Sequence, residues 1–227
     1  MPFVALLVLL VLSACSAPER EPQQALAVPV GFVPRTVSFV ARPKLLSPTG
    51  TLTLHVPARY DTLLTWLDQA DTPMGDKAKY RFVGASGCLL QESGFYKAGT
   101  VCQDTLDRLT IITQMTSSAA ESLTTVARRI EHMDEVSRGL DLAPTVWKAK
   151  KLLAVHGRTF SVVESFGGST MVATPYEQVR AVTVLQSAGY NWEVTLLFEC
   201  KQRNCQNLAR EAYQTLQSVR LDTAARR

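Results

Sequence analysis

Three kinds of side chain in this 227-residue sequence have the chemistry for catalysis: histidines, a serine beside glycines, and paired carboxylates. The histidines are His55, His132 and His156. None lies at a spacing that brings two metal ligands to one helix face, because Glu131 and His132 are merely adjacent. We therefore expect no metal site from the histidines.

Ser169 follows Gly167 and Gly168 and loosely resembles the serine of a hydrolase elbow. It lacks the second flanking glycine and leads into a further predicted strand rather than a helix. A Gly-Gly pair between strands is more typical of a turn or bulge. Carboxylate pairs such as Asp104 with Asp107 lie in polar stretches, without the burial that acid–base catalysis needs. The sequence predicts a protein that is not an enzyme and binds no cofactor.

The apolar run from Phe3 to Leu12 ends in the tetrad Leu12-Ser13-Ala14-Cys15. A run of about ten residues is too short for a bilayer, which needs roughly 20, but it suits a signal peptide. The tetrad resembles the lipobox of bacterial lipoproteins, although no Lys or Arg precedes the run. In that family the chain is cut before the cysteine, which is then acylated. The resemblance implies a lipid anchor on Cys15 and, because Ser16 follows, the outer membrane with the domain facing the periplasm.

The sequence divides into a signal peptide (1–14), a lipidated cysteine with a tether (15–35) and one globular domain (36–227). The tether is rich in proline and polar residues and has too little apolar surface to fold alone. The formal net charge is +4, with a small cluster at Lys148, Lys150 and Lys151. We interpret this cluster as a solvated face. Acidic partners or lipid head groups are the alternative, and nucleic acid is not expected.

Four cysteines remain after Cys15, and an even number outside the cytoplasm favours disulfides. Of the three possible pairings we favour Cys88 with Cys102 and Cys200 with Cys205. The first pair would close a loop, and the second would join the end of a strand to the following helix. A zinc site is the alternative, but the spacing does not suit one on both sides.

Phe95 and Tyr96 lie between Cys88 and Cys102. An aromatic pair on a loop held by a disulfide is a candidate anchor for a protein partner. The alternative is that both rings fold back onto the domain.

Polar–apolar alternation predicts strands over 51–56, 80–83, 109–115, 152–156, 159–165, 169–174, 179–186 and 192–199. A hairpin is expected around Gly157-Arg158. Helices are predicted over 61–70, after the capping box Ser118-x-x-Glu121, and at the C-terminal end through Leu208, Ala212, Leu216 and Val219.

This order predicts a single α+β domain in which two to three helices pack on an antiparallel sheet. From Leu109 onward, the element order and the ending Leu216-Gln-Ser-Val-Arg-Leu221 resemble the PsbP-like fold family, which includes photosystem subunits and small bacterial lipoproteins. A cystatin-like or NTF2-like curved sheet fits the same pattern. The PsbP-like resemblance implies a binding or assembly role, since that fold is not tied to one catalytic site.

We therefore expect a non-catalytic envelope lipoprotein that binds another protein, as an accessory subunit of an envelope or secretion assembly. One alternative is a periplasmic immunity protein that neutralises a secreted toxin. Another is a carrier of lipid or a small ligand, because a curved sheet under helices can enclose an apolar cavity.

Overall fold

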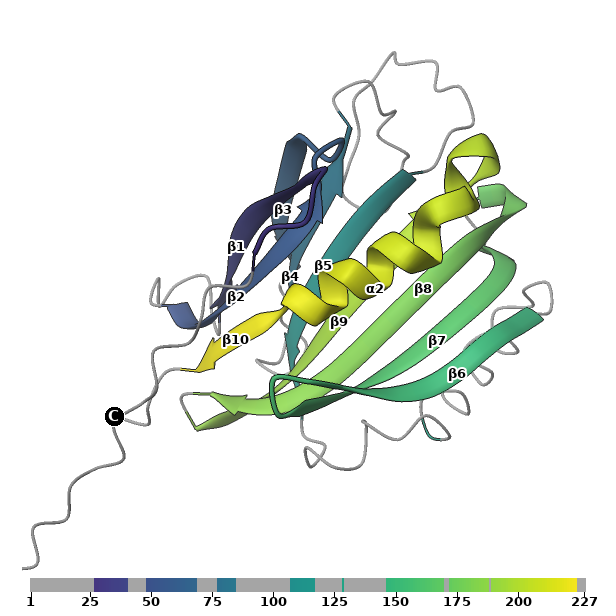
Figure 1. Cartoon of the computed structure of the whole chain (residues 1–227). Coiled ribbons are helices and arrows are strands. Elements are labelled where there is room, and N and C mark those ends of the chain that lie inside the picture. Colours follow the sequence, from purple (N-terminus) through teal and green to yellow (C-terminus); the bar gives the residue numbers. More distant parts are fainter. Residues whose placement is uncertain are drawn as a thin grey trace, which may run out of the picture.

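The computed structural model describes residues 27–40, 48–68, 77–84, 107–116, 128, 146–169, 172–187 and 189–223. In this part of the chain, two antiparallel sheets and one α-helix form the fold (Figure 1). The larger sheet has the order β3 (Thr62–Asp68), β4 (Lys77–Val83), β5 (Asp107–Met115), β9 (Tyr190–Cys200), β8 (Val172–Ser187), β7 (Arg158–Ser169) and β6 (Val146–Val155).

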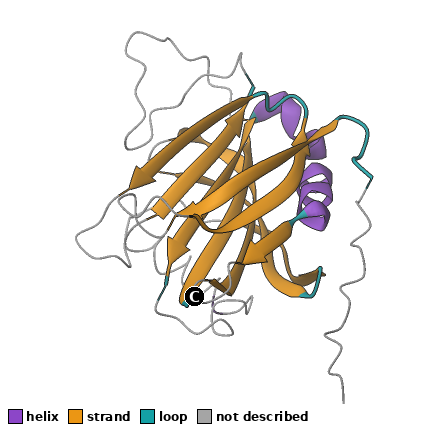
Figure 2. Ribbon diagram, turned by 90° about the vertical axis from the view of Figure 1, so that its left-hand side faces the viewer, coloured by secondary structure: helices purple, strands orange, loops and turns teal. Residues whose placement is uncertain are grey.

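The smaller sheet has the order β1 (Phe32–Val40), β2 (Pro48–Pro57) and β10 (Arg220–Thr223). The 3-10 helix η3 (Gln202–Asn207) and the α-helix α2 (Leu208–Ser218) connect β9 to β10. The helix packs against β2, β8 and β9, so α2 and the smaller sheet together cover one face of the larger sheet (Figures 1 and 2).

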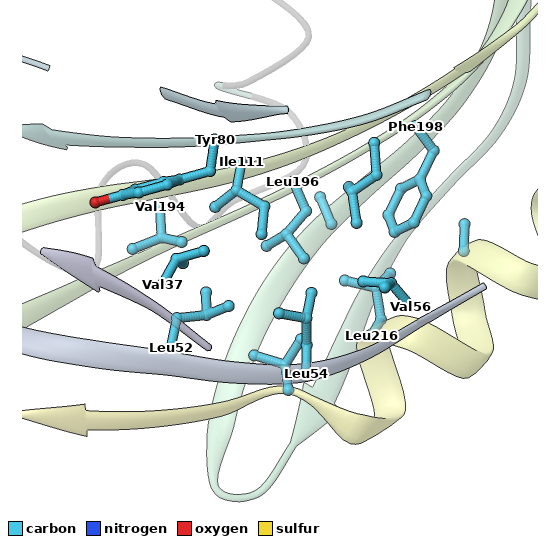
Figure 3. Packing of buried hydrophobic residues seen from close by; sticks show 14 of the residues in the cluster. Val37, Leu52, Leu54, Val56, Tyr80, Ile111, Val194, Leu196, Phe198 and Leu216 are labelled. Carbon is cyan, nitrogen blue, oxygen red and sulfur yellow. The ribbon is translucent and has the colours of Figure 1, made fainter. Parts of the chain in front are cut away.

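The hydrophobic core fills the space between these layers (Figure 3). Leu52 and Leu54 of β2 approach it from one side, and Ile111 and Leu196 of the larger sheet approach it from the other. At its margin the Tyr80 hydroxyl donates to the carbonyl of Ser38, which links the two sheets. Burial of these apolar side chains is the main force that holds the layers together.

Strand β9 shows how the sequence sets this arrangement. Its alternate side chains all face the core and are at most 1% exposed: Trp192, Val194, Leu196 and Phe198. The strand predicted over 192–199 is therefore confirmed. The other face is also buried in part, because Glu199 is 3% exposed and pairs with Arg108 of β5 at 2.5 Å.

The helix predicted over 61–70 is wrong, because β3 occupies Thr62–Asp68 and pairs with β4. Leu63, Leu64 and Leu67 fit a helical stripe, but a short apolar pattern also fits a strand. Pairing decides the outcome, since β3 satisfies the backbone groups of β4 on the side away from β5.

The antiparallel sheet is confirmed, but the described part of the chain is richer in sheet than expected and holds one α-helix of several turns instead of two to three. The helix predicted after Ser118 lies outside the described residues, apart from Arg128.

The strand predicted over 169–174 is only partly confirmed, because β7 continues to Ser169 and β8 begins at Val172 and runs on to Ser187 as one strand. The register shifts between Gly167 and Ser169, so the glycines lie at the irregularity that a Gly-Gly pair favours. The predicted hairpin is present, one residue earlier than expected. Its turn is His156-Gly157, both with positive φ (47° and 76°), as a two-residue hairpin turn requires.

Candidate interaction surface

A polar network joins the β2–β3 turn to β5 and α2. Arg59 Nε donates to Asp107 Oδ2 at 2.7 Å, and Arg59 Nη2 donates to Glu211 Oε2 at 2.7 Å. The Tyr60 hydroxyl donates to Asp107 Oδ1 at 2.6 Å, and the Arg59 guanidinium lies 4.5 Å from the centre of the Tyr60 ring. Both carboxylates are therefore engaged by the same guanidinium.

Burial and charge set the protonation of this network. Burial alone would lower the pKa of Arg59, but the hydrogen bonds that its guanidinium donates to Asp107 and Glu211 outweigh burial and raise the pKa above its ordinary value. Burial, together with the negative charge of Asp107, raises the pKa of Tyr60 well above its usual 10. At neutral pH the network thus contains a fixed cation and a neutral phenol, which suits a structural clamp.

A shallow pocket of about 260 Å³ lies beside this network and is lined in part by Arg59, Arg210 and Gln214. Sites for drug-sized ligands usually have about 300–1,000 Å³ and enclose most of the ligand. This pocket is smaller and open, so we do not assign a ligand to it.

Two of the three histidines contact the end of α2. His156 Nε2 lies 3.2 Å from the carbonyl oxygen of Gln217, and the backbone N–H of His55 donates to Ser218 Oγ at 2.7 Å. Each histidine therefore helps to fix the helix end. Within the described ranges, no group of three or more His, Cys, Asp or Glu side chains is arranged to hold a metal ion.

Cys200 and Cys205 form a disulfide with a Cα–Cα distance of 5.4 Å. It joins the end of β9 to η3, as predicted for this pair from the sequence. The other predicted site residues lie outside the described residues: Cys15, Cys88, Phe95, Tyr96 and Cys102.

Among the described strands and helices, the two most exposed large apolar side chains belong to β6, the strand at one end of the larger sheet (Figure 1). Val146 is 58% exposed and Leu152 is 57% exposed, and Phe166 on the neighbouring β7 is 39% exposed. Strand β6 pairs with β7 on one side and is the last strand in the sheet order. We call the outward side of β6 (Val146–Val155) the β6 edge.

Lysines line the β6 edge and lie over aromatic rings. Lys150 Nζ is 5.4 Å from the Trp147 ring centre, and Lys151 Nζ is 3.7 Å from that of Tyr213. Lys148 pairs with Glu177 at 2.8 Å, where both side chains are more than a third exposed. The β6 edge therefore combines positive charge with apolar and aromatic surface.

The lysine cluster was evident in the sequence, but its location on an edge strand was not. A strand was predicted only from Leu152, while β6 begins at Val146. The segment from Lys148 to Lys151 has two adjacent lysines and a register shift after Trp147, so it lacks a clean alternation. The signal available in the sequence was the cluster of lysines beside Trp147.

No helix among the described residues has the length and apolar character to cross a membrane.

Comparison with known proteins gives distant structural matches. No protein-family model matches the sequence, and no curated protein matches it significantly. The solution structure of cyanobacterial PsbP from Synechocystis sp. PCC 6803 matches at a TM-score of 0.45 and 12% identity, over 86% of this chain and 95% of that chain. LpqN of Mycobacterium tuberculosis, described as involved in cell envelope biogenesis, matches at 0.43 and 10%, over 83% and 91%. The first is a PsbP, the family that the element order resembles, but at these TM-scores neither match assigns a functional residue here.

Proposed function

We propose that this protein is a non-catalytic envelope lipoprotein that binds another protein through the β6 edge. The observation that carries the proposal is the exposure of Val146 and Leu152 on a ten-residue strand at the end of the larger sheet. An exposed edge strand is a template for pairing with another chain, and proteins usually shorten or cover it. Here the edge is long, and its sequence contains no proline.

The composition of the β6 edge also suits a protein partner. Interfaces are enriched in aromatic side chains, which carry much of the binding energy when a partner covers them. Trp147 and Phe166 lie at or beside the edge, each under a lysine. A partner would bury apolar surface and meet positive charge in the same place.

The envelope location rests on the tetrad ending at Cys15. Eleven residues lie between Cys15 and Ala27, where the described part begins, and the two ends are at most about 40 Å apart when this segment is extended. An acylated Cys15 would thus hold the domain close to the membrane. Replacing Cys15 by Ser should move the protein to the soluble fraction, and retention in the membrane fraction would contradict the anchor.

Site-specific photo-cross-linking in cells tests the binding role. We expect a cross-linker at Leu152 to capture one defined protein. The matched control is a cross-linker at Asp222, which is exposed on β10 of the smaller sheet. Equal capture at both positions, or none at Leu152, would rule out the β6 edge as the binding surface.

The finer assignment is an accessory subunit of an envelope or secretion assembly. It predicts that deletion weakens envelope integrity or secretion in a pure culture. A deletion strain that is impaired only when a toxin-producing neighbour is present would instead identify an immunity protein.

A further inference from the structure

We infer that the β6 edge takes an extended acidic segment of the partner, which adds to the larger sheet as an eighth strand beside β6. This inference rests on the proposed function and gives the partner its chemistry.

The backbone of β6 can accept such a strand. In an antiparallel pair, residues alternate between those that bond to the neighbour and those whose N–H and C=O groups point away. The pairing of β6 with β7 therefore leaves about half of its ten residues with outward groups. None of the ten is proline, so each outward residue has both a donor and an acceptor.

The charge of the β6 edge selects an acidic segment. The cations of Lys150 and Lys151 lie over rings, and the described residues provide neither with a carboxylate within ion-pair distance. Lys148 has Glu177, but this exposed pair contributes little by itself. The rings also restrict the lysine side chains before binding, which lowers the entropic cost of forming new ion pairs.

The register places these groups on both faces of the added strand. Lys151 lies opposite Val162, a core-facing residue, while Lys150 and Leu152 lie opposite Val163 and Ser161 on the other face. A fitting segment therefore has a carboxylate on each face and an apolar side chain near Leu152, which is 57% exposed.

A second copy of the chain is a poor occupant. Residues directly opposite each other in an antiparallel pair share a face, so two β6 edges paired about Lys150 or about Lys151 would place that lysine opposite its own copy. Like charges directly opposite destabilise a strand pair. Lysines are also a common device against edge-to-edge association, so the same side chains that disfavour self-pairing favour an acidic partner.

The test uses the full chain with the C15S substitution and a capped ten-residue peptide of Glu, Val and Thr, in which two adjacent Glu residues place a carboxylate on each face of the strand. One control peptide has every second backbone amide N-methylated, and another has Lys in place of Glu. We expect the acidic peptide to bind and to slow amide exchange across residues 146–155.

N-methylation of the peptide should abolish binding, and the K150E/K151E variant of the protein should bind the acidic peptide about tenfold more weakly. The K150Q/K151Q variant, with a thermal melt for each protein, separates loss of charge from loss of folding.

Any other result of these experiments would refute a specific part of the proposal. Equal binding of the N-methylated peptide would mean ion pairing without strand addition. Binding to vesicles that contain phosphatidylglycerol, with no binding to any peptide, would assign the lysines to a lipid surface. A specific cross-link at Leu152 without acidic-peptide binding would leave the proposed function in place and refute the acidic partner. Failure of both would refute both.

Discussion

At the scale of single residues, Tyr60 is the most buried member of the network around Arg59. It is 1% exposed, and its hydroxyl donates to Asp107. Burial raises its pKa above the ordinary value of 10, so the folded state holds the phenol proton more tightly than the unfolded chain does. The contribution of this proton to stability is complete below pH 10 and is lost as the pH rises above it.

Replacing Tyr60 by Phe should lower the free energy of unfolding by about 1–2 kcal/mol at neutral pH, because one buried hydrogen bond is lost. Above about pH 10 the unfolded wild-type chain releases the phenol proton, which lowers the free energy of unfolding of the wild type. The variant has no phenol proton, so its free energy of unfolding is not affected in this way. Urea unfolding at several pH values should therefore show a difference that narrows as the solution becomes alkaline. A difference that stays constant or widens would contradict the buried-phenol account.

Glu199 makes a second prediction at this scale, because it and Arg108 form an ion pair in which both side chains are at most 4% exposed. Replacing Glu199 by Gln should cost about 3–5 kcal/mol, since it leaves the guanidinium buried without its carboxylate. The matched control is Glu177→Gln, which breaks the exposed pair with Lys148 and should cost less than about 1 kcal/mol. Equal losses in the two variants, measured by denaturant unfolding, would show that burial does not govern these pairs.

At the scale of elements, β2 is closely flanked by β1 and β10 at Gly50. A Cβ atom at this position would lie 2.7 Å from Cδ2 of Phe39 and 2.8 Å from the carbonyl oxygen of Asp222. The absence of a side chain at Gly50 thus lets all three strands of the smaller sheet approach one another.

Replacing Gly50 by Ala should destabilise the protein by about 1–3 kcal/mol, because the backbone of β10 or the Phe39 ring must shift. Thr51→Ala, one residue further along the same strand, is the control and should change the unfolding free energy by less than about 1 kcal/mol. Thermal unfolding of the two variants would measure the contrast, and a neutral Gly50→Ala would show that the smaller sheet adapts to the methyl group.

Strands in which polar and apolar residues alternate strictly were predictable from the sequence. Strands whose conformation depends on pairing with another strand were not. The alternation in β9 gave the core-facing side correctly, because one face of this strand is wholly apolar. The three leucines of β3 fit the spacing of a helix as well as that of a strand, and only the pairing with β4 decides in favour of a strand. The β6 edge was not predictable either, since the order of strands in a sheet depends on contacts between residues far apart in the sequence.

At the scale of the whole molecule, one face of the larger sheet is covered by other elements, whereas β6 lies at the end of the same sheet. The smaller sheet and α2 cover one face of the larger sheet, where the core lies. The β6 edge stands at the end of the sheet order and continues the same hydrogen-bonding plane. An added strand would therefore extend the larger sheet without disturbing the core, so binding at the β6 edge would require no rearrangement of the layers.

The pairing of β10 with β2 has a further consequence for the time course of folding. Leu221 lies opposite Leu52, so residues 169 positions apart must meet before the smaller sheet is complete. Contacts of such long range make folding slow, because the chain loses the entropy of closing a long loop before these contacts stabilise it. A nascent chain cannot close this sheet until the segment that forms β10 has emerged. The order of strands thus postpones completion of the smaller sheet until nearly the whole chain has been synthesised.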